Sequence, residues 1–522
     1  MFFRFLNIFS GETRHDRILL LITALFFHAM FWTFAPTFFL PNYQIDTMEM
    51  MVIGQNWVLS TFKHPAFQGW LVEILSLIFH RAEFVPYLAS QIACVLTVFT
   101  VWKFARKILA PKFALLAALT LLSYSYFHYD STIYNNRTFM RFFWIAALYF
   151  LYLALEKNKK RYWILTGVAL GLGMYCKFAI VVLIVAILIF MFCEPRARKH
   201  WKTSRPYLSI GGCFLIVFPL LAWILQHHFQ QLNYTLLSIG KEKSTFFDHF
   251  CSPIRFFVTQ IPIVAMLLIP AYPVIGVRWK FDFKKCRTDT TGRFLTFFIF
   301  MPLFLQMIIA FFFAGDMRTA LGCHLWLLFP MFLFYTLKIP AVNEKYFSRS
   351  MKFVFSNIFL FAAITIFVTQ FSPIFTGKSS RYHFSGKELA QSVQIIWSER
   401  YSTPIPFVRG DDWLTENACV YIHPNPKVYS VLWSKEEDFR KKGGVLLWLV
   451  GESGKPPRHS LRSFFGNRDF YYSLETGQPD EWLKQFPNVK ILPPLEISPK
   501  TIVKVPPIKI GIAIVPPDPL QH

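Results

Sequence analysis

Charged residues are scarce in this chain of 522 residues, and acidic ones are the scarcest, with 30 Asp and Glu against 54 Lys and Arg. Charged residues make up only 16% of the sequence, whereas soluble globular domains carry about 25%. This shortage excludes an ordinary soluble protein. The formal net charge of +24 does not indicate nucleic-acid binding either, because the basic residues alternate with apolar runs instead of lining one surface.

Several sequence motifs with well-defined chemistry are also lacking. The 8 cysteines include no C-x-x-C spacing, so neither a zinc cage nor a disulfide framework is indicated. The C-terminal region has no glycine-rich phosphate loop and no nucleophile elbow. No small-residue cleavage site precedes the first apolar run, so we expect this run to remain as a membrane anchor.

Apolar residues are abundant, at 54% of the chain, and they gather in long runs. A helix needs about 20 apolar residues to cross the hydrocarbon core of a bilayer. We therefore predict an α-helical polytopic membrane protein with about eleven spans. The predicted spans are 18–40, 84–102, 113–127, 138–155, 162–175, 178–193, 207–226, 256–277, 294–314, 322–337 and 353–371. The fifth and sixth spans could instead form one long helix.

The basic loops predict the orientation of these spans, because cytoplasmic loops of membrane proteins are rich in Lys and Arg. With eleven spans and a cytoplasmic N-terminus, all five basic loops fall on the cytoplasmic side. They lie within residues 103–112, 157–161, 196–205, 278–293 and 338–352. We expect them to attract anionic lipid headgroups.

The chain divides by composition into a membrane domain, 1–371, and an extracytoplasmic domain, 372–522, in which charge and proline return. Alternating patterns predict that the second part is a small α/β domain. The expected helices are 385–401, 411–420, 434–441 and 480–486, and the expected strands are 405–409, 427–432, 444–450 and 500–515. A structural or acceptor-guiding role suits this domain better than a second catalytic centre.

The first extracytoplasmic loop, 41–83, combines acidic groups with apolar surroundings. Asp46 and Glu49 are three residues apart, so on a helix they share one face. Their neighbours up to Leu59 are mostly apolar, which predicts an interfacial helix with its acids turned toward water or a cavity. On spacing alone, a helix cap at Asp46 is the stronger interpretation, because Asp often occupies that position.

Lys63, in the sequence Lys63-His64-Pro65, follows this helix within the same loop. A cation placed near the acid pair could stabilise the negative charge that develops on a departing phosphate. The alternative is a lysine that anchors the loop at the membrane surface, with its ammonium group among the lipid headgroups. Taken alone, Lys63 favours the anchor.

The order of several motifs resembles the GT-C superfamily of lipid-linked glycosyltransferases. The resemblance is to the aminoarabinose-transferase-like and protein-O-mannosyltransferase-like branch, the glycosyltransferase family 39-like proteins. The first-loop pattern D-x-x-E followed by K-H-P-x-x-x-x-W is the starting point. The resemblance extends to residues 142–150, to the glycine-rich segment 167–173 with Lys177 after it, and to residues 384–390 and 411–414 of the C-terminal domain.

The resemblance implies an inverting transfer of a sugar from a polyprenyl-phosphate donor. It also implies an acceptor outside the cytoplasm: lipid A or lipopolysaccharide, another envelope glycan, or a protein. Asp46 matches the family's catalytic acid, supported by Glu49, and Lys63 matches its phosphate-binding lysine. Lys177 and Arg318 are further candidates for the donor phosphate, although Arg318 could instead pair with Asp316. The protein is then expected in a bacterial inner membrane, with its C-terminal domain in the periplasm.

Two departures from the family pattern concern the second part of the site. The common H-P-P-L is His64-Pro65-Ala66-Phe67 here, and the acid expected before the fourth span is Asn136, with Asp130 nearby. His64, Asp130 and Asn136 are therefore candidates for an acceptor or second site. No cofactor is firmly implied, and a divalent metal stays an open alternative. A polytopic lipid or solute transporter or flippase is the rival function, although few charges lie within the predicted spans.

Overall fold

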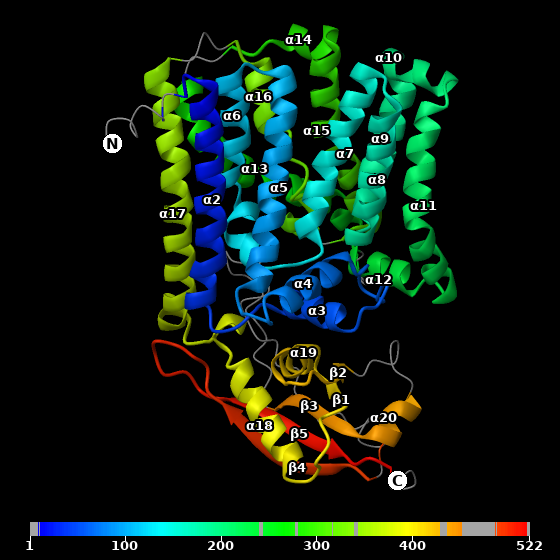
Figure 1. Ribbon diagram of the computed structural model, residues 1–522, viewed down its shortest axis with the longest axis vertical. Helices are drawn as coiled ribbons and strands as arrows, with labels where there is room; N and C mark the ends of the chain where they lie inside the picture. Colours follow the sequence, from blue (N-terminus) through cyan, green and yellow to red (C-terminus); the bar gives the residue numbers. More distant parts are fainter. Residues whose placement is uncertain are drawn as a thin grey trace. The chain divides into compact units, whose positions relative to one another are not determined.

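The structure is a computed structural model that describes residues 9, 11–239, 244–276, 280–315, 317–338, 343–428, 436–450, 486 and 488–518. The described chain is mostly helical, with a small sheet near the C-terminus (Figure 1). It forms two compact units. The helical unit comprises residues 1–35, 62–68 and 87–363, and the α/β unit comprises residues 36–61, 69–86 and 364–522.

The described residues include seven helices that are long and apolar enough to cross a membrane, or eight if one bent pair is a single span. The seven are α2 (Arg14–Phe39), α5 (Val85–Ile108), α7 (Arg137–Lys157), α11 (Arg205–Gln226), α13 (Phe246–Ile275), α15 (Thr290–Phe313) and α17 (Glu344–Thr376). The bent pair is α9 (Ile180–Cys193) with residues 195–202, which include α10 (Pro195–Arg198). An integral membrane protein is thereby confirmed.

Each of the eleven predicted spans contains a helix, but the count of eleven is not confirmed. The remaining segments are short: α6 (Pro111–Thr120), α8 (Lys160–Cys176) and α16 (Phe329–Thr336). The fifth and sixth predicted spans are separate helices, since Lys177 has an extended backbone with φ −164° and ψ 140° after α8. Further helices of the helical unit include α12 (Gln230–Ile239), α14 (Phe283–Thr288) and the 3₁₀ turn η5 (Thr319–Gly322).

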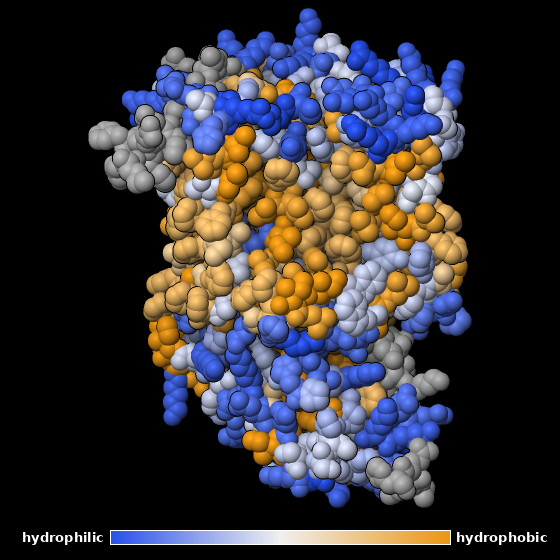
Figure 2. Space-filling model, in the orientation of Figure 1, coloured by the Kyte–Doolittle hydropathy of each residue, from blue (hydrophilic) through white to orange (hydrophobic). Residues whose placement is uncertain are grey.

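The five basic loops meet at one end of the helical unit. Arg205 donates a hydrogen bond to Asn158 Oδ1 at 2.6 Å, and Arg293 pairs with Glu194 at 2.8 Å. The remaining loops join through Lys338 and Asp282, 3.7 Å apart, and through Lys112, which lies over the ring of Phe347. Figure 2 shows this end, near α10 and α14, as hydrophilic, beside an apolar band over the helices. That this end faces the cytoplasm stays a prediction.

Glycine permits close helix packing where the sequence showed a glycine-rich segment. A Cβ on Gly167 of α8 would lie 2.1 Å from the carbonyl oxygen of Ser209 in α11, and one on Gly171 would lie 2.9 Å from Ile216. Only glycine allows the two backbones to approach this closely. The segment therefore fixes how α8, which ends at Cys176 directly before Lys177, packs in the helical unit.

The α/β unit contains a five-stranded mixed sheet in the order β2-β1-β3-β5-β4. Its strands are β1 (Phe407–Gly410), β2 (Lys427–Val428), β3 (Gly444–Val450), β4 (Lys490–Ile497) and β5 (Ile508–Val515). The first three are parallel, and β5 runs antiparallel to both β3 and β4. The C-terminal helices are α18 (Gly386–Ser398), α19 (Asp412–Tyr421) and α20 (Glu436–Lys442), and two more, α3 (Ile45–Gln55) and α4 (Phe67–Ile78), come from the first loop.

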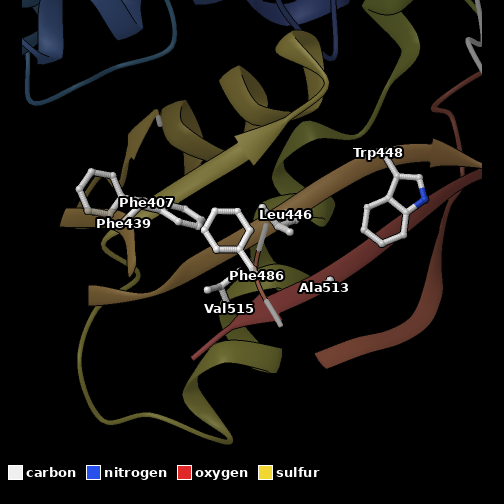
Figure 3. Close-up of a cluster of buried hydrophobic side chains, with 7 residues drawn as sticks. All are labelled: Phe407, Phe439, Leu446, Trp448, Phe486, Ala513 and Val515. Atoms are coloured by element: carbon white, nitrogen blue, oxygen red, sulfur yellow. The ribbon is translucent and has the colours of Figure 1, made fainter. Parts of the chain in front are cut away.

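Aromatic side chains fill the core beside the sheet (Figure 3). Phe407 of β1, Phe439 of α20 and Phe486 pack together, with ring centroids 5.1–5.8 Å apart for the contacts through Phe439. Trp448 of β3 covers Gly511 of β5, where a Cβ would lie 2.1 Å from the indole ring. A side chain at Gly511 would therefore displace Trp448.

The prediction of a small C-terminal α/β domain is confirmed. Strand β3 has the predicted bounds, and Asp411 caps α19 by accepting a hydrogen bond from Leu414 N at 3.1 Å. Strand β4 was not predicted. The predicted helix 480–486 lies almost entirely outside the described residues, as do residues 429–432 and 434–435 of two other predicted elements.

Candidate active site

The acid pair lies on α3 in the α/β unit. Gln44 occupies the N-cap with extended backbone, φ −75° and ψ 156°, so Asp46 lies in the first helical turn and Glu49 one turn later. Both acids are half-buried, whereas Met48, Met50 and Ile53 between and after them are at most 1% exposed. The pair thus shares the polar face of a helix whose other face is packed. The cap belongs to Gln44, although a carboxylate in the first turn also interacts favourably with the helix dipole.

Two glycines fix the position of α3 against α4. A Cβ on Gly54 would lie 2.2 Å from Gly69 O, and one on Gly69 would lie 2.7 Å from the side chain of Ile53. The loop between the helices is held by Trp70, whose indole N–H donates to Val58 O at 2.8 Å. The two helices therefore pack backbone to backbone, which leaves α3 little freedom to shift.

The Lys63–His64 segment lies in the helical unit, where two other cations approach it. Burial lowers the pKa of His64 well below its usual value. The positive charges of Lys177, Lys63 and Arg137 lower it further, because each disfavours a charged imidazolium. His64 also meets Tyr234 of α12 edge to face at 6.2 Å. Lys63, Lys177 and Arg137, named here the cation cluster, thus all lie within electrostatic range of the His64 ring.

Gln68 connects the segments that carry the cation cluster. Its side-chain amide donates to Asn136 O at 2.7 Å, and its backbone carbonyl accepts from Tyr134 O–H at 2.8 Å. The same amide interacts with the thiol of Cys176, which directly precedes Lys177. Gln68 is fully buried, so these contacts are shielded from water. Gln68 therefore holds Asn136, which precedes Arg137, and Cys176, which precedes Lys177, beside the Lys63 segment.

Asp130 and two arginines lie within electrostatic range of Tyr126. Tyr126 experiences the charges of Asp130, Arg137 and Arg141, and its hydroxyl donates to Thr319 O at 2.9 Å. The chain at Arg318 therefore lies beside this group, with an exposed Arg318 side chain. Asp316, the alternative partner of Arg318, is outside the described residues.

A buried histidine lies near two of the basic side chains. The ring of His324 is within electrostatic range of Lys177 and Arg141, and it packs on Trp144 with centroids 4.0 Å apart. Gln306 lies 3.0 Å from its Nε2. Arg141 itself is only 4% exposed. In this described region the helical unit therefore brings together one carboxylate, that of Asp130, and four cations: Lys63, Lys177, Arg137 and Arg141. This excess of positive charge suits the binding of an anion.

The structure divides the predicted site residues into two sets. Lys63, His64 and Lys177 come together in the helical unit, and Asp130, Asn136 and the chain at Arg318 adjoin them through Arg137 and Tyr126. Asp46 and Glu49 share α3 in the α/β unit. Asn136 presents its backbone carbonyl to Gln68 and supplies no carboxylate at the position of the expected second acid.

Arg137, Arg141, Gln68 and His324 were missed by sequence reasoning. Arg137 directly follows the Asn136 that stood out as a departure from the family pattern, which was the one available signal. Among the described residues, no group of three or more His, Cys, Asp or Glu side chains is arranged to hold a metal ion.

Residues 63–223 match the model of the dolichyl-phosphate-mannose-protein mannosyltransferase family. This match begins at Lys63 and includes Arg137 and Lys177. A search of curated protein sequences found no match.

Among solved structures, the chain is similar to ArnT from Cupriavidus metallidurans bound to undecaprenyl phosphate. The TM-score is 0.60 at 10% identity, covering 96% of this chain and 98% of that one. The apo structure of the same protein gives a TM-score of 0.57 at 11% identity, covering 95% and 97%. At such identity the likeness establishes the fold. The chain therefore has an ArnT-like fold, and the match to the mannosyltransferase family model covers residues 63–223.

Proposed function

We propose that this protein is a glycosyltransferase that moves a sugar from a polyprenyl-phosphate donor to an acceptor outside the cytoplasm, with inversion at the anomeric carbon. The observation that carries the proposal is the cation cluster around His64 in a membrane-embedded unit. A phosphate that bears a long isoprenoid chain needs both a cationic site and an apolar surround. The structural relative ArnT, which holds undecaprenyl phosphate, supports the same donor class.

The reaction is a direct displacement. Asp46 accepts the proton of an acceptor hydroxyl or phosphate as that oxygen bonds to the anomeric carbon. The bond from this carbon to the phosphate oxygen breaks, and its electron pair leaves with the polyprenyl phosphate. A positioned general base typically contributes about 10²–10⁴-fold. Glu49, one turn along the same face of α3, supports Asp46 or orients the acceptor.

The cations act on the leaving group. Lys63 binds the donor phosphate, and Lys177 and Arg137 add positive charge where negative charge develops in the transition state. Arg318, exposed at the start of η5, is a further phosphate ligand. His64, Asp130 and Asn136 contact the acceptor or a second part of the site. In this proposal the acceptor is lipid A or lipopolysaccharide, another envelope glycan, or a protein.

The proposed location is the bacterial inner membrane, with residues 1–371 as the catalytic membrane domain and 372–522 as a periplasmic domain. The gathering of all five basic loops at one end of the helical unit supports a cytoplasmic position for that end. A reporter active only outside the cytoplasm should work after Thr376 and fail after Lys285. The opposite pattern would reverse the topology and move the site with it.

The central test is transfer by the purified full-length protein in lipid, with a polyprenyl-phosphate sugar as donor. Asp46→Asn should reduce transfer by about 10²-fold or more, because the amide cannot accept the proton. Asp16→Asn makes the same chemical change in the first turn of α2, where Asp16 bonds only to Thr13 in the helix start, and should leave transfer unchanged. Transfer by Asp46→Asn at the wild-type rate, with the same thermal stability, would exclude Asp46 as the base.

A further inference from the structure

The segment that leads into α3 is buried to an unusual degree for a connecting loop. Asn42, Tyr43 and Gln44 are 2%, 5% and 4% exposed. Connecting segments normally run over the surface, because a buried one must find partners for its polar groups. The partners of Asn42 and Tyr43 include residues more than 300 positions later in the sequence, in the same α/β unit.

Both ends of the Asn42 side chain bond to the C-terminal domain. Its amide nitrogen donates to Asn417 Oδ1 at 3.0 Å, and its amide oxygen accepts from Tyr421 O–H at 3.0 Å. The nitrogen also lies 3.5 Å from Arg381 O. Asn417 and Tyr421 lie one turn apart on α19, which packs on α3. We call Asn42, Asn417 and Tyr421 the asparagine clasp.

The clasp itself is held in place by the C-terminal domain. Asn417 is fully buried and donates to Trp413 O at 2.7 Å, which fixes the orientation of its amide. Gly386 of α18 makes room for it, since a Cβ there would lie 2.2 Å from Asn417 Oδ1. The Asn417 oxygen is thus aimed at Asn42 by two helices of the domain.

Neighbouring contacts bind the two ends of the first loop to each other and to the same domain. Tyr43 stacks on Tyr421 with centroids 6.2 Å apart and planes 8° apart, and its hydroxyl donates to Glu83 O at 2.7 Å. The Glu83 carboxylate in turn pairs with Lys387 of α18 at 2.5 Å. Both the beginning and the end of the 41–83 loop are therefore attached to the C-terminal domain.

We propose that the C-terminal domain positions the catalytic helix through the asparagine clasp, so that Asn417 and Tyr421 are positioning residues for Asp46. Asn42 lies only four residues before Asp46, and Gln44 between them starts α3. A displacement of about 1 Å in a reacting group can cost about 100-fold in rate. This inference rests on the proposed function in assigning Asp46 its role, and it gives the domain a part in the chemical step.

The first experiment separates positioning from folding by kinetics on the full-length protein. Asn417→Leu keeps the branched shape of the side chain but removes both amide contacts, and should lower kcat for sugar transfer about tenfold or more. Tyr421→Phe keeps the stack on Tyr43 and loses one donor, so it should give a smaller loss in kcat. Binding of polyprenyl phosphate should stay within twofold in both, because the cation cluster belongs to the other unit.

Asn425→Ala is the matched control, because Asn425 makes its amide bonds to Cys419 O and Val420 O within the same domain, and neither is a residue of the clasp. It should transfer at the wild-type rate. Adding Asn417→Leu to Asp46→Asn should reduce the transfer rate little further. The base that Asn417 positions is already absent in Asp46→Asn, so its displacement has no additional effect. Additive losses, or equal losses of donor binding and kcat, would overturn the positioning role.

Hydrogen exchange tests the clasp without any reference to activity. Asn417→Leu and Tyr421→Phe should both speed amide exchange in α3, residues 45–55, and leave β3 and β5 unchanged. Unchanged exchange in α3 would refute the clasp even if transfer falls. Conversely, a wild-type protein that transfers no sugar would refute the proposed function, while faster exchange in α3 would still support the clasp.

Discussion

The first loop contributes to both units, and its two contributions are built differently. In the α/β unit it supplies two acids from one short helix. The relative position of these acids depends only on the helical geometry of α3. In the helical unit it supplies Lys63. The other cations beside His64, Arg137 and Lys177, come from much later parts of the chain. The acids are therefore a local feature, whereas the cation cluster exists only because distant segments pack together.

This difference predicts that sugar transfer, which depends on the two acids, is lost when α3 moves. Gly54→Ala would place a methyl group 2.2 Å from Gly69 O, so the helices must separate. We expect about 1–3 kcal/mol of lost stability and about 100-fold lower transfer. Gly212→Ala is the control, because its Cβ would meet nothing closer than 3.8 Å. Thermal melts and transfer rates measure both effects, and near-wild-type transfer by Gly54→Ala would show that α3 tolerates movement.

Donor binding, which depends on the cation cluster, should weaken when Gln68 is replaced. Gln68→Leu keeps the side-chain size but deletes the hydrogen bond to Asn136 O and the contact with Cys176. We expect affinity for polyprenyl phosphate to fall about tenfold, equivalent to about 1.4 kcal/mol. Gln91→Leu removes another buried amide, bonded to Ser131 Oγ, and should keep full affinity. Equal affinities for the two variants would show that Gln68 does not organise the cation cluster.

The features that could be predicted from the sequence follow the same division between local and distant contacts. Apolar runs predicted the membrane class, and a D-x-x-E spacing predicted the shared face of Asp46 and Glu49, because these signals are local. Arg137 and Gln68 gave no comparable signal, since their roles depend on segments that meet only in the fold. The asparagine clasp was equally hidden, because Asn42 and Asn417 are 375 residues apart.

The C-terminal domain illustrates the same limit at the level of elements. Strand β3 is a continuous apolar run, and its bounds were predicted correctly. Strand β4 contains Pro493 and Pro494, which normally argue against a strand. The structure accommodates them at an edge, where pairing with β5 shifts register between Leu492 and Leu495. The neighbouring strand therefore decides the outcome, and sequence pattern alone does not.

A smaller effect should appear in the pH dependence of stability. The folded-state pKa of His64 lies well below its usual value of 6.5. As pH falls through about 6.5, the unfolded chain binds a proton that folded His64 refuses, so stability decreases toward acid and is fully present above that pH. His64→Gln should therefore flatten the loss of thermal stability between pH 7 and pH 5, measured by melting curves. An unchanged acid slope would mean that His64 is freely protonated in the folded protein.

The most direct test of the division between chemistry and donor binding compares Asp46→Asn and Lys63→Ala in one pair of assays. Polyprenyl-phosphate affinity and single-turnover transfer rate are measured for each folded variant at a saturating donor concentration. Asp46→Asn should retain wild-type affinity and lose about 10²-fold or more in rate. Lys63→Ala should lose both, because its cation contacts the phosphate in the bound donor and in the transition state. Weakened donor binding by Asp46→Asn, or unaltered binding by Lys63→Ala, would contradict the account.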